Sequence, residues 1–490
     1  MLEKINTTIS RILLVFASVI LCVSCSKNLL TPVDQTSISD ATAFDTPDRI
    51  LAQVNGLYAA VKDGDFYGGR LIIYNELRAD EFIMNKPNIV TGQLTWSQSV
   101  SSSTSEVSSL WSTGYAAINQ INIFLQGLQQ NSSKVSDSLF EHYYGEARFL
   151  RALCYFALVQ TYAKPYAADG GSSPGLPLRL KAEKSAADND LARSSVADIY
   201  AQILKDLDSA EIQLPEAYTS ASLNTTRAHK NTAIALKTRV YLTMGNYGKV
   251  ISEAGKIVSA HAPYQAETGV NNKLEANILD VFSGSYDGSE AVFSLPFTAT
   301  ETPGTQNQLA YYFNTSPGNA EFFLNPEGTL SDPVFAQASA DARKGLILSS
   351  GGKEWLSKFK VPLSYSDWIP VIRYAEVLLN YAEAAARSHD LPTALALLNA
   401  VRKRSDPGYV FPAAAVATES ALINTILTEK KIEFLGEGFR VPDLQRQMKT
   451  LPGKAGPAGS APAVEPSESK YIWPIPSSEL ATNTLCEPNP

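Results

Sequence analysis

The sequence predicts a mostly α-helical protein: a scaffold of paired helices with long irregular loops and few short strands. Apolar residues recur at helical spacing in several long segments, and a two-helix pattern returns along the chain. The stretches between these pairs contain many glycines and prolines and show no helical period. With 490 residues, of which 44% are hydrophobic and 18% charged, the chain can bury a large core.

The first helices are predicted over residues 50–61, 110–128, 142–162 and 196–214. In each of them the apolar side chains form one stripe, which is typical of a helix packed on a core. Small and large residues alternate in 142–162, so a partner helix can approach it closely. Pro165 ends that helix, and 196–214 is expected to pack back on it in an antiparallel direction.

The same two-helix pattern then appears twice more. In 232–258 the two helices meet at Gly245-Asn246-Tyr247, and in 374–404 they meet at His389-Asp390-Leu391. Helix pairs of about 34 residues with contacts between small residues resemble tetratricopeptide repeats. We therefore expect a tetratricopeptide-repeat-like helical scaffold spread along the chain.

Two long segments lack this pattern. Residues 264–369 are interrupted by glycine and proline throughout, and a loop of that length in a compact protein is usually functional. Residues 451–469 are rich in Pro, Gly, Ala and Ser, which predicts an exposed, flexible loop.

The N-terminus has the pattern of a secretion signal. Lys4 and Arg11 precede an apolar run over 12–23, which as a helix reaches only ~18 Å and is too short for a ~30 Å hydrocarbon core. Small residues then lead to Cys25, and this arrangement resembles a bacterial lipobox. Cys22 is the alternative acylation site, although it places bulky Leu21 at the cleavage position, and ordinary secretion is the alternative to acylation.

The predicted organisation follows from that signal. Residues 1–24 form a signal peptide that is removed, the acylated Cys25 becomes the lipid anchor, and 25–47 form a polar tether. Residues 48–490 form one domain, with an N-terminal part over about 48–215 and a C-terminal part over about 285–490.

Charge and motifs exclude several classes of function. The formal net charge is −8 and the basic residues are scattered among acids, which argues against nucleic acid as a partner. The four histidines stand far apart, and the sequence has no metal motif, phosphate-binding loop or nucleophile elbow. We expect no catalytic residues, metal or cofactor. Glu429, Glu433 and Glu437 recur every four residues and predict a solvated or ion-paired helix face.

A series of motifs, taken in order, resembles the SusD/RagB family of Bacteroidetes. These motifs are EARFLRALCYF, ALKTRVYLTMGNY, IRYAEVLLNYAEA, LLNAVRKR, EKKIEFLGEGFR and YIWPIPSSEL, and they begin at residues 146, 235, 372, 397, 429 and 471. The family commonly has Trp after the arginine of its EGxR motif, whereas here Val441 follows Arg440. The C-terminus also departs from the usual NPGY-like tail.

The resemblance implies a function without catalysis. Proteins of this family are outer-membrane lipoproteins that lie over a SusC-type TonB-dependent barrel and bind nutrients for it, mostly glycans. A peptide-binding member of the family and a tetratricopeptide interaction scaffold without a ligand are the alternatives.

Ligand-binding residues are expected on the loops. Neutral sugars are held by aromatic rings and by planar polar groups that bind hydroxyls. Trp96 and Tyr286 are the first candidates, and Trp355 and Trp368 are outer ones. For Arg78 and Asp80 an internal salt bridge is the alternative. The predicted ligand set is Trp96, Tyr286, Tyr67, Phe66, Arg78, Asp80, Tyr311, Tyr312 and Asn314.

Overall fold

The computed structural model describes residues 42–185, 189–284, 286–315, 318–360 and 366–489. The predicted signal peptide 1–24, the lipid anchor Cys25 and most of the tether 25–47 lie outside the described residues, so they remain predictions. The first described helix is capped by Thr46, whose hydroxyl accepts a bond from the backbone N–H of Arg49.

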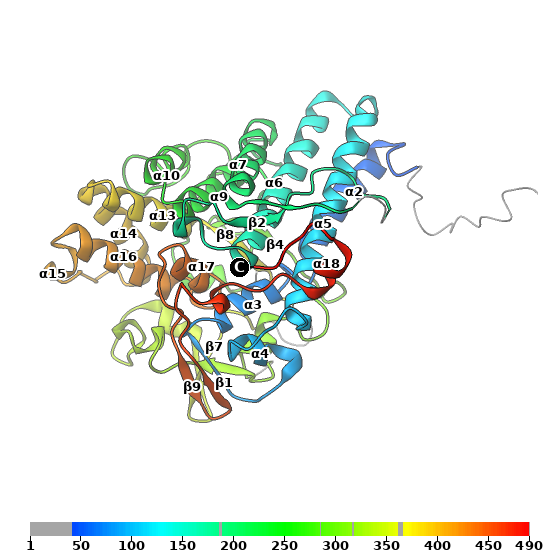
Figure 1. Ribbon diagram of the computed structural model, residues 1–490. Coiled ribbons are helices and arrows are strands. Elements are labelled where there is room, and N and C mark those ends of the chain that lie inside the picture. The colour runs from blue at the N-terminus through cyan, green and yellow to red at the C-terminus, as the bar shows by residue number, and fades with distance from the viewer. Residues whose placement is uncertain (1–41, 186–188, 285, 316–317, 361–365, 490) are drawn as a thin grey trace, which may run out of the picture.

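Long helices form the scaffold, and the predicted fold class is confirmed. In Figure 1 they pass from α5 and α6 at the upper right to α13, α14 and α16 at the left. Their bounds are α2 (Pro47–Val61), α5 (Ser105–Gln130), α6 (Asp137–Tyr162), α7 (Val196–Gln213), α9 (Lys230–Thr243), α10 (Tyr247–Ala254), α13 (Tyr374–Arg387), α14 (Leu391–Ser405) and α16 (Glu419–Glu433).

The helix pairs form for the local reasons that the sequence indicates. A Cβ atom on Gly145 would lie only 3.0 Å from Cβ of Gln213, so the small residue in α6 lets α7 approach. Gly245 has a φ of 71°, and the side chain of Asn246 then caps α10. Asp390 caps α14 in the same way.

Short elements fill the space between the pairs. The short helices are α3 (Arg70–Leu77), α4 (Gln93–Trp96), α8 (Ala221–Thr226), α11 (Ile278–Val281), α12 (Leu309–Phe313), α15 (Ala413–Val416), α17 (Arg440–Gln445) and α18 (Ser477–Thr482). Within the described ranges the strands form only two-stranded antiparallel pairs. These are β1 (Phe82–Met84) with β5 (Phe322–Leu324), β2 (Pro174–Pro177) with β3 (Arg193–Ser195), β4 (Ala291–Leu295) with β8 (Ile369–Arg373), β6 (Ile347–Ser350) with β7 (Lys353–Leu356), and β9 (Lys454–Gly456) with β10 (Gly459–Ala461). Because β4 pairs with β8, the long 296–368 segment leaves the scaffold and returns to it at one place.

The segment 451–469 is mostly exposed, as predicted, but it differs from the predicted flexible loop. It is an ordered hairpin, β9–β10, and Leu451 and Val464 at its base are buried and exchange two backbone hydrogen bonds of 2.9 Å. The buried ammonium of Lys454 donates to the carbonyl oxygens of Leu77 and Ala79 at the end of α3. Its composition predicts flexibility, but these anchors fix it on the core.

The charged residues at the end of α16 are buried and ion-paired. Glu429 and Glu433 are wholly buried, and Glu437 is nearly so. Their arginine partners, Arg343 and Arg373, are also buried. The ion-paired alternative for this helix face is therefore confirmed, and the solvated one is wrong.

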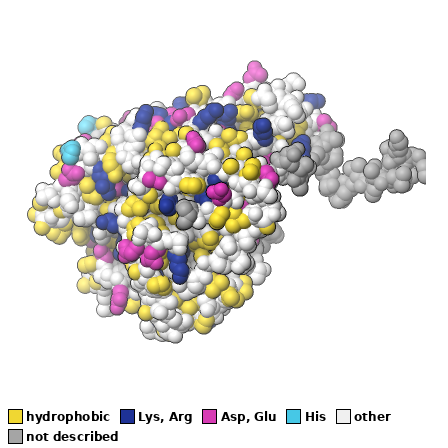
Figure 2. Space-filling model, in the orientation of Figure 1, with side chains coloured by type: hydrophobic (Ala, Val, Ile, Leu, Met, Phe, Trp, Pro, Cys, Tyr) yellow, Lys and Arg dark blue, Asp and Glu magenta, His cyan; other side chains and the backbone are white. Residues whose placement is uncertain are grey.

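The structure also describes the two cysteines of the folded part, the character of its helices and the charges on its surface. Cys154 and Cys486 are both free and buried, so the described part of the chain has no disulfide between them. Of the described helices, none combines the length and the apolar character that crossing a bilayer requires. On the face drawn in Figure 2, basic and acidic side chains are interspersed among the described residues.

Candidate functional site

The long central segment folds back onto the turn that follows α2. A Cβ atom on Gly64 would overlap the carbonyl oxygen of Pro303, and one on Gly69 would overlap that of Asn307. Glycine is therefore required at both points of contact. Contacts join several segments here, and we call them together the insertion face: residues 62–70, 85–92, 286, 296–315, 318–320 and 366–368.

An aromatic pair forms one end of the insertion face. The rings of Tyr286 and Trp368 lie nearly parallel, with an interplanar angle of 15° and centroids 5.6 Å apart. Both side chains are half-buried. The Tyr286 hydroxyl donates to Oδ1 of Asp367 at 2.8 Å, and Nε1 of Trp368 donates to the Phe297 carbonyl at 3.2 Å. The two rings are thus held in place before any ligand arrives.

Tyr286 is held in an unusual backbone conformation. Its φ is 48°, in the left-handed region that bulky residues rarely adopt. Such strain costs on the order of 1–3 kcal/mol and collects at functional sites. Burial, and then the neighbouring Asp367 carboxylate, raise the pKa of Tyr286 well above its usual value. The hydroxyl therefore stays neutral, and its proton remains available for the bond to Asp367.

A lysine connects this aromatic end to the centre of the face. Lys62 Nζ donates to the Pro296 carbonyl at 2.9 Å and pairs with Glu301 at 2.8 Å. It also lies 5.3 Å from the centre of the Phe297 ring. The charge of Lys62 is therefore used within the loop itself.

Tyr311 and a group of side-chain amides form the other end. The Tyr311 hydroxyl accepts from Nδ2 of Asn319 at 3.0 Å and from Nε2 of Gln306 at 3.3 Å. Arg70 Nε donates to Oδ1 of Asn307 at 2.7 Å. Next to them Val90, whose carbonyl accepts from Arg70, is 57% exposed. Aromatic surface and planar polar groups thus occur together at this end.

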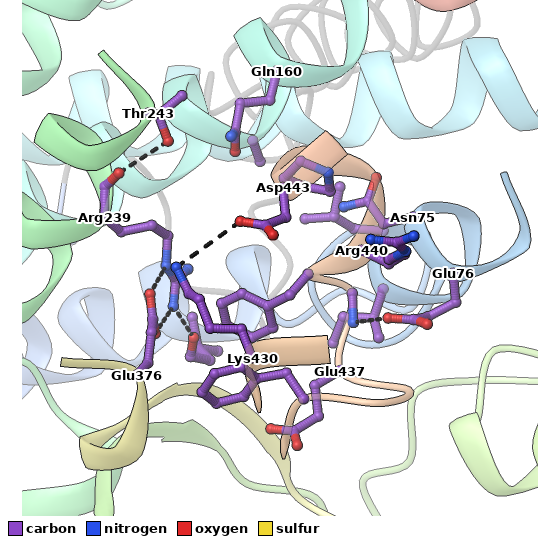
Figure 3. Close-up of a pocket in the computed structure, with 18 of the residues that line it drawn as sticks. Asn75, Glu76, Gln160, Arg239, Thr243, Glu376, Lys430, Glu437, Arg440 and Asp443 are labelled. Atoms are coloured by element: carbon purple, nitrogen blue, oxygen red, sulfur yellow. Dashed lines mark hydrogen bonds and ion pairs between the residues drawn. The ribbon is translucent and has the colours of Figure 1, made fainter. Parts of the chain in front are cut away.

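A separate cavity lies on the other side of α3, shown in Figure 3. Arg70 and Tyr74 of α3 contact each other on the side of the insertion face, whereas Asn75 and Glu76 line the cavity together with side chains from α6, α9, α16 and α17. The cavity contains about 100 Å³ of free space. We call it the central cavity.

An ion pair crosses the floor of the central cavity. Arg239 binds both carboxylate oxygens of Glu376, at 2.5 and 2.6 Å, and its guanidinium lies 4.9 Å from the centre of the Phe439 ring. In the described part of the chain, no group of three or more His, Cys, Asp or Glu side chains could hold a metal ion.

Comparison with known families settles which family this architecture represents. Residues 33–242 match the family described as starch-binding and associating with the outer membrane, and residues 358–490 match the SusD family. The fold also superimposes, with a TM-score of 0.80, on a SusD superfamily protein from Bacteroides fragilis that is 32% identical over 91% of this chain and 99% of that one. The chain belongs to the SusD/RagB family.

Other SusD-like proteins are similar over nearly the same length. SusD-like protein P2 of Formosa agariphila is 24% identical over 95% of this chain and 96% of its own. A laminarin-binding SusD-like protein shares the fold with a TM-score of 0.69, at 21% identity over 91% of this chain and 99% of that one.

Several residues of the predicted ligand set are buried in the fold, and the prediction that they contact a ligand is corrected. Trp96 is fully buried and donates Nε1 to the Phe82 carbonyl at 2.8 Å. Arg78 is buried as well and donates to the Tyr471 carbonyl. The other buried members of the predicted set are Phe66, Tyr67, Tyr312, Asn314 and the outer candidate Trp355. Each of these side chains packs in the interior of the protein.

Asp80 follows the alternative that the sequence left open. It pairs with Arg440 at 3.0 Å, and although burial opposes ionisation, that arginine lowers its pKa. Tyr286 and Tyr311 lie on the insertion face, so their role in binding remains a prediction. Arg70 and the amides around Tyr311 escaped sequence reasoning, because only the fold brings them to one surface.

Proposed function

We propose that this SusD/RagB-family protein captures neutral glycans at the cell surface and delivers them to a SusC-like TonB-dependent outer-membrane transporter. It performs no catalysis and is anchored to the outer membrane through acylated Cys25. The observation that carries this proposal is the fixed Tyr286–Trp368 pair on the insertion face.

The chemistry of the face suits a sugar chain. A preformed aromatic pair offers apolar ring surface to the CH faces of a pyranose without the cost of ordering two side chains. Gln306 and Asn319 place side-chain amide groups around Tyr311 at the other end. Planar groups of this kind bind pairs of neighbouring hydroxyls.

The relatives support a polysaccharide as the ligand. One matching family is described as starch-binding, and one solved SusD-like protein of the same fold binds laminarin. The half-exposed rings and neutral amides of the insertion face fit such uncharged polymers better than they fit the charged termini of a peptide.

Native gels that contain different polysaccharides would test the proposal. The chain from Ser26 onward is run beside a Tyr286→Ala, Trp368→Ala double variant. We expect one class of neutral glycan to retard the wild type, and the double variant to lose most of this retardation.

A matched control is available on α6. Phe140 and Tyr144 form a half-buried stacked pair of similar geometry, with centroids 5.5 Å apart, and their double alanine variant should be retarded like the wild type. If no glycan retards the wild type, the ligand is a peptide or the protein is an interaction scaffold.

A further inference from the structure

The central cavity contains polar groups that the fold itself leaves unsatisfied. We propose that it binds a single neutral sugar ring, as a second site separate from the insertion face. The ring is either a free monosaccharide or the end residue of a captured glycan. The choice of a sugar as the ligand rests on the proposed function, whereas the existence of the site rests on the geometry of the cavity.

Two side-chain amides lie at the cavity wall with nothing to bind. Asn75 comes from α3 and Gln160 from α6. Both side chains are half-buried, and within the described ranges neither makes a hydrogen bond. Figure 3 shows Gln160 reaching into the cavity from above. Each amide offers a donor and an acceptor in one plane, which is the arrangement that two adjacent hydroxyls satisfy.

A buried carboxyl group adds a third unsatisfied position. Glu76 is 1% exposed, and its Oε1 accepts from the backbone N–H of Gly438 at 2.6 Å. Its Oε2 has no hydrogen-bond partner among the described residues. Burial and then nearby Glu81 raise the pKa of Glu76 to about 8, so at neutral pH the group is largely protonated. The wall of the cavity at Glu76 is therefore largely uncharged, which suits a neutral ligand.

The charges of the cavity argue for a neutral ligand. Arg239 is matched by Glu376, whereas Lys430 and Arg446 are both matched by Glu383. These cations therefore have carboxylate partners of their own. An ionic ligand would have to displace one of these buried pairs, which is costly.

The remaining walls and the size of the cavity fit one ring. Phe156 of α6 and the two contacting rings of Phe434 and Phe439 supply apolar surface. The free space is small, about 100 Å³, so any longer glycan would have to leave the rest of its length outside.

Calorimetric titration of the chain from Ser26 with a panel of neutral hexoses tests the site. We expect one or more hexoses to bind the wild type. Affinity should fall by about tenfold or more in an Asn75→Ala, Gln160→Ala double variant, because the hydrogen bonds of both amides to the sugar are lost. Gln126→Ala, which removes an exposed glutamine of α5, is the matched control and should bind like the wild type.

Circular dichroism checks that the double variant is folded, and Gln160→Trp gives a second route, because it fills the cavity without removing Asn75. Wild-type protein that binds no hexose, or folded cavity variants that bind like the wild type, would overturn the proposal.

The same titration shows whether the bound ring is a free monosaccharide or the end residue of a glycan. It also separates this proposal from the proposed glycan binding at the insertion face. If the cavity variants also weaken binding of oligosaccharides, the chain end enters the cavity; if only monosaccharide binding falls, the ligand is the free sugar. If polysaccharide retards the protein but no hexose binds, the proposal for the insertion face stands and the proposal for the central cavity fails. If hexose binds but no polysaccharide retards the protein, the cavity proposal stands and the proposal for the insertion face fails.

Discussion

The central segment of the chain has two sides with opposite properties. On one side it joins a buried charge layer, defined here as Arg343, Arg373, Arg402, Arg404 and Lys358 with Asp341, Glu290, Glu429, Glu433 and Glu437. On the other side it forms the insertion face, whose aromatic and amide groups remain half-exposed. Polar groups therefore serve stability on one side and are available to a ligand on the other.

The two sides differ in how completely their polar groups form ion pairs and hydrogen bonds within the protein. Arg373 contacts Glu290, Glu433 and Glu437 at 2.5–2.9 Å with 2% of its side chain exposed. Although burial opposes ionisation, Arg404 and Arg373 hold the pKa of Glu433 well below its usual value. The charge layer thus fixes the insertion on α14 and α16, and this rigid attachment is what can hold the opposite face in shape.

The largest expected effect comes from breaking the charge layer. Arg373→Leu would leave Glu433 and Glu437 buried without their main partner, and we expect the free energy of unfolding to fall by about 3–5 kcal/mol. Urea denaturation measures this change. Arg49→Ala removes an arginine from a half-exposed pair with Asp45 and should cost less than about 1 kcal/mol. If both variants lose the same free energy of unfolding, the buried charge layer is no more important for stability than a surface ion pair.

Two tryptophans provide the next contrast. Trp96→Ala creates a core cavity and should reduce stability by about 3–5 kcal/mol, whereas Trp368→Ala at the half-buried position should cost less than about 1.5 kcal/mol. Affinity for the glycan should show the opposite order, with Trp368→Ala about tenfold weaker. Thermal melts and affinity gels on both variants test the pair. A Trp368→Ala protein that is strongly destabilised but binds normally would make Trp368 a core residue.

The regular part of the fold could be predicted because its signals are local. The stripe in 142–162, the turn at Gly245 and the cap at Asp390 each lie within a few residues of the helix that they define. The helices α6, α7, α10 and α14 begin or end where these signals indicate, within a few residues.

The site could be predicted only in part because its contacts are distant in sequence. Trp96 and Trp368 look alike in the sequence, and the fold alone buries the first under β1 and leaves the second at the surface. Arg70 meets Asn307 across 237 positions of the chain. No period or motif records such a contact, so the amides of the insertion face and of the central cavity could not be inferred.

Glu76→Gln tests whether the carboxyl group of Glu76, at the central cavity, is protonated in the folded protein or ionised like the acids of the charge layer. The folded-state pKa of Glu76, about 8, lies above its ordinary value of 4.5. The folded protein therefore binds this proton more tightly than the unfolded chain, and the contribution of Glu76 to stability falls as pH rises from about 4.5 to about 8. The glutamine variant should lose this decline and gain about 1–3 kcal/mol relative to wild type between pH 5 and pH 8.

Urea denaturation at pH 5 and pH 8 measures the gain. The comparison matters because the pKa of Glu433 in the charge layer shifts in the opposite direction, so Glu433 contributes stability that is lost only in acid. If Glu76→Gln and wild type change in parallel between the two pH values, the carboxyl is ionised in the fold and belongs with the layer.

The smallest effect concerns how far the insertion face extends. Ile89 is 62% exposed beside Val90 at the Tyr311 end, so Ile89→Asn should change stability by less than about 0.5 kcal/mol. If the glycan covers both ends of the face, this variant should still weaken retardation by about twofold, because a partly covered apolar side chain is lost. Ile212→Asn is the matched control, since Ile212 is 84% exposed on α7, away from the face. Equal retardation of both variants would confine the ligand to the Tyr286–Trp368 end.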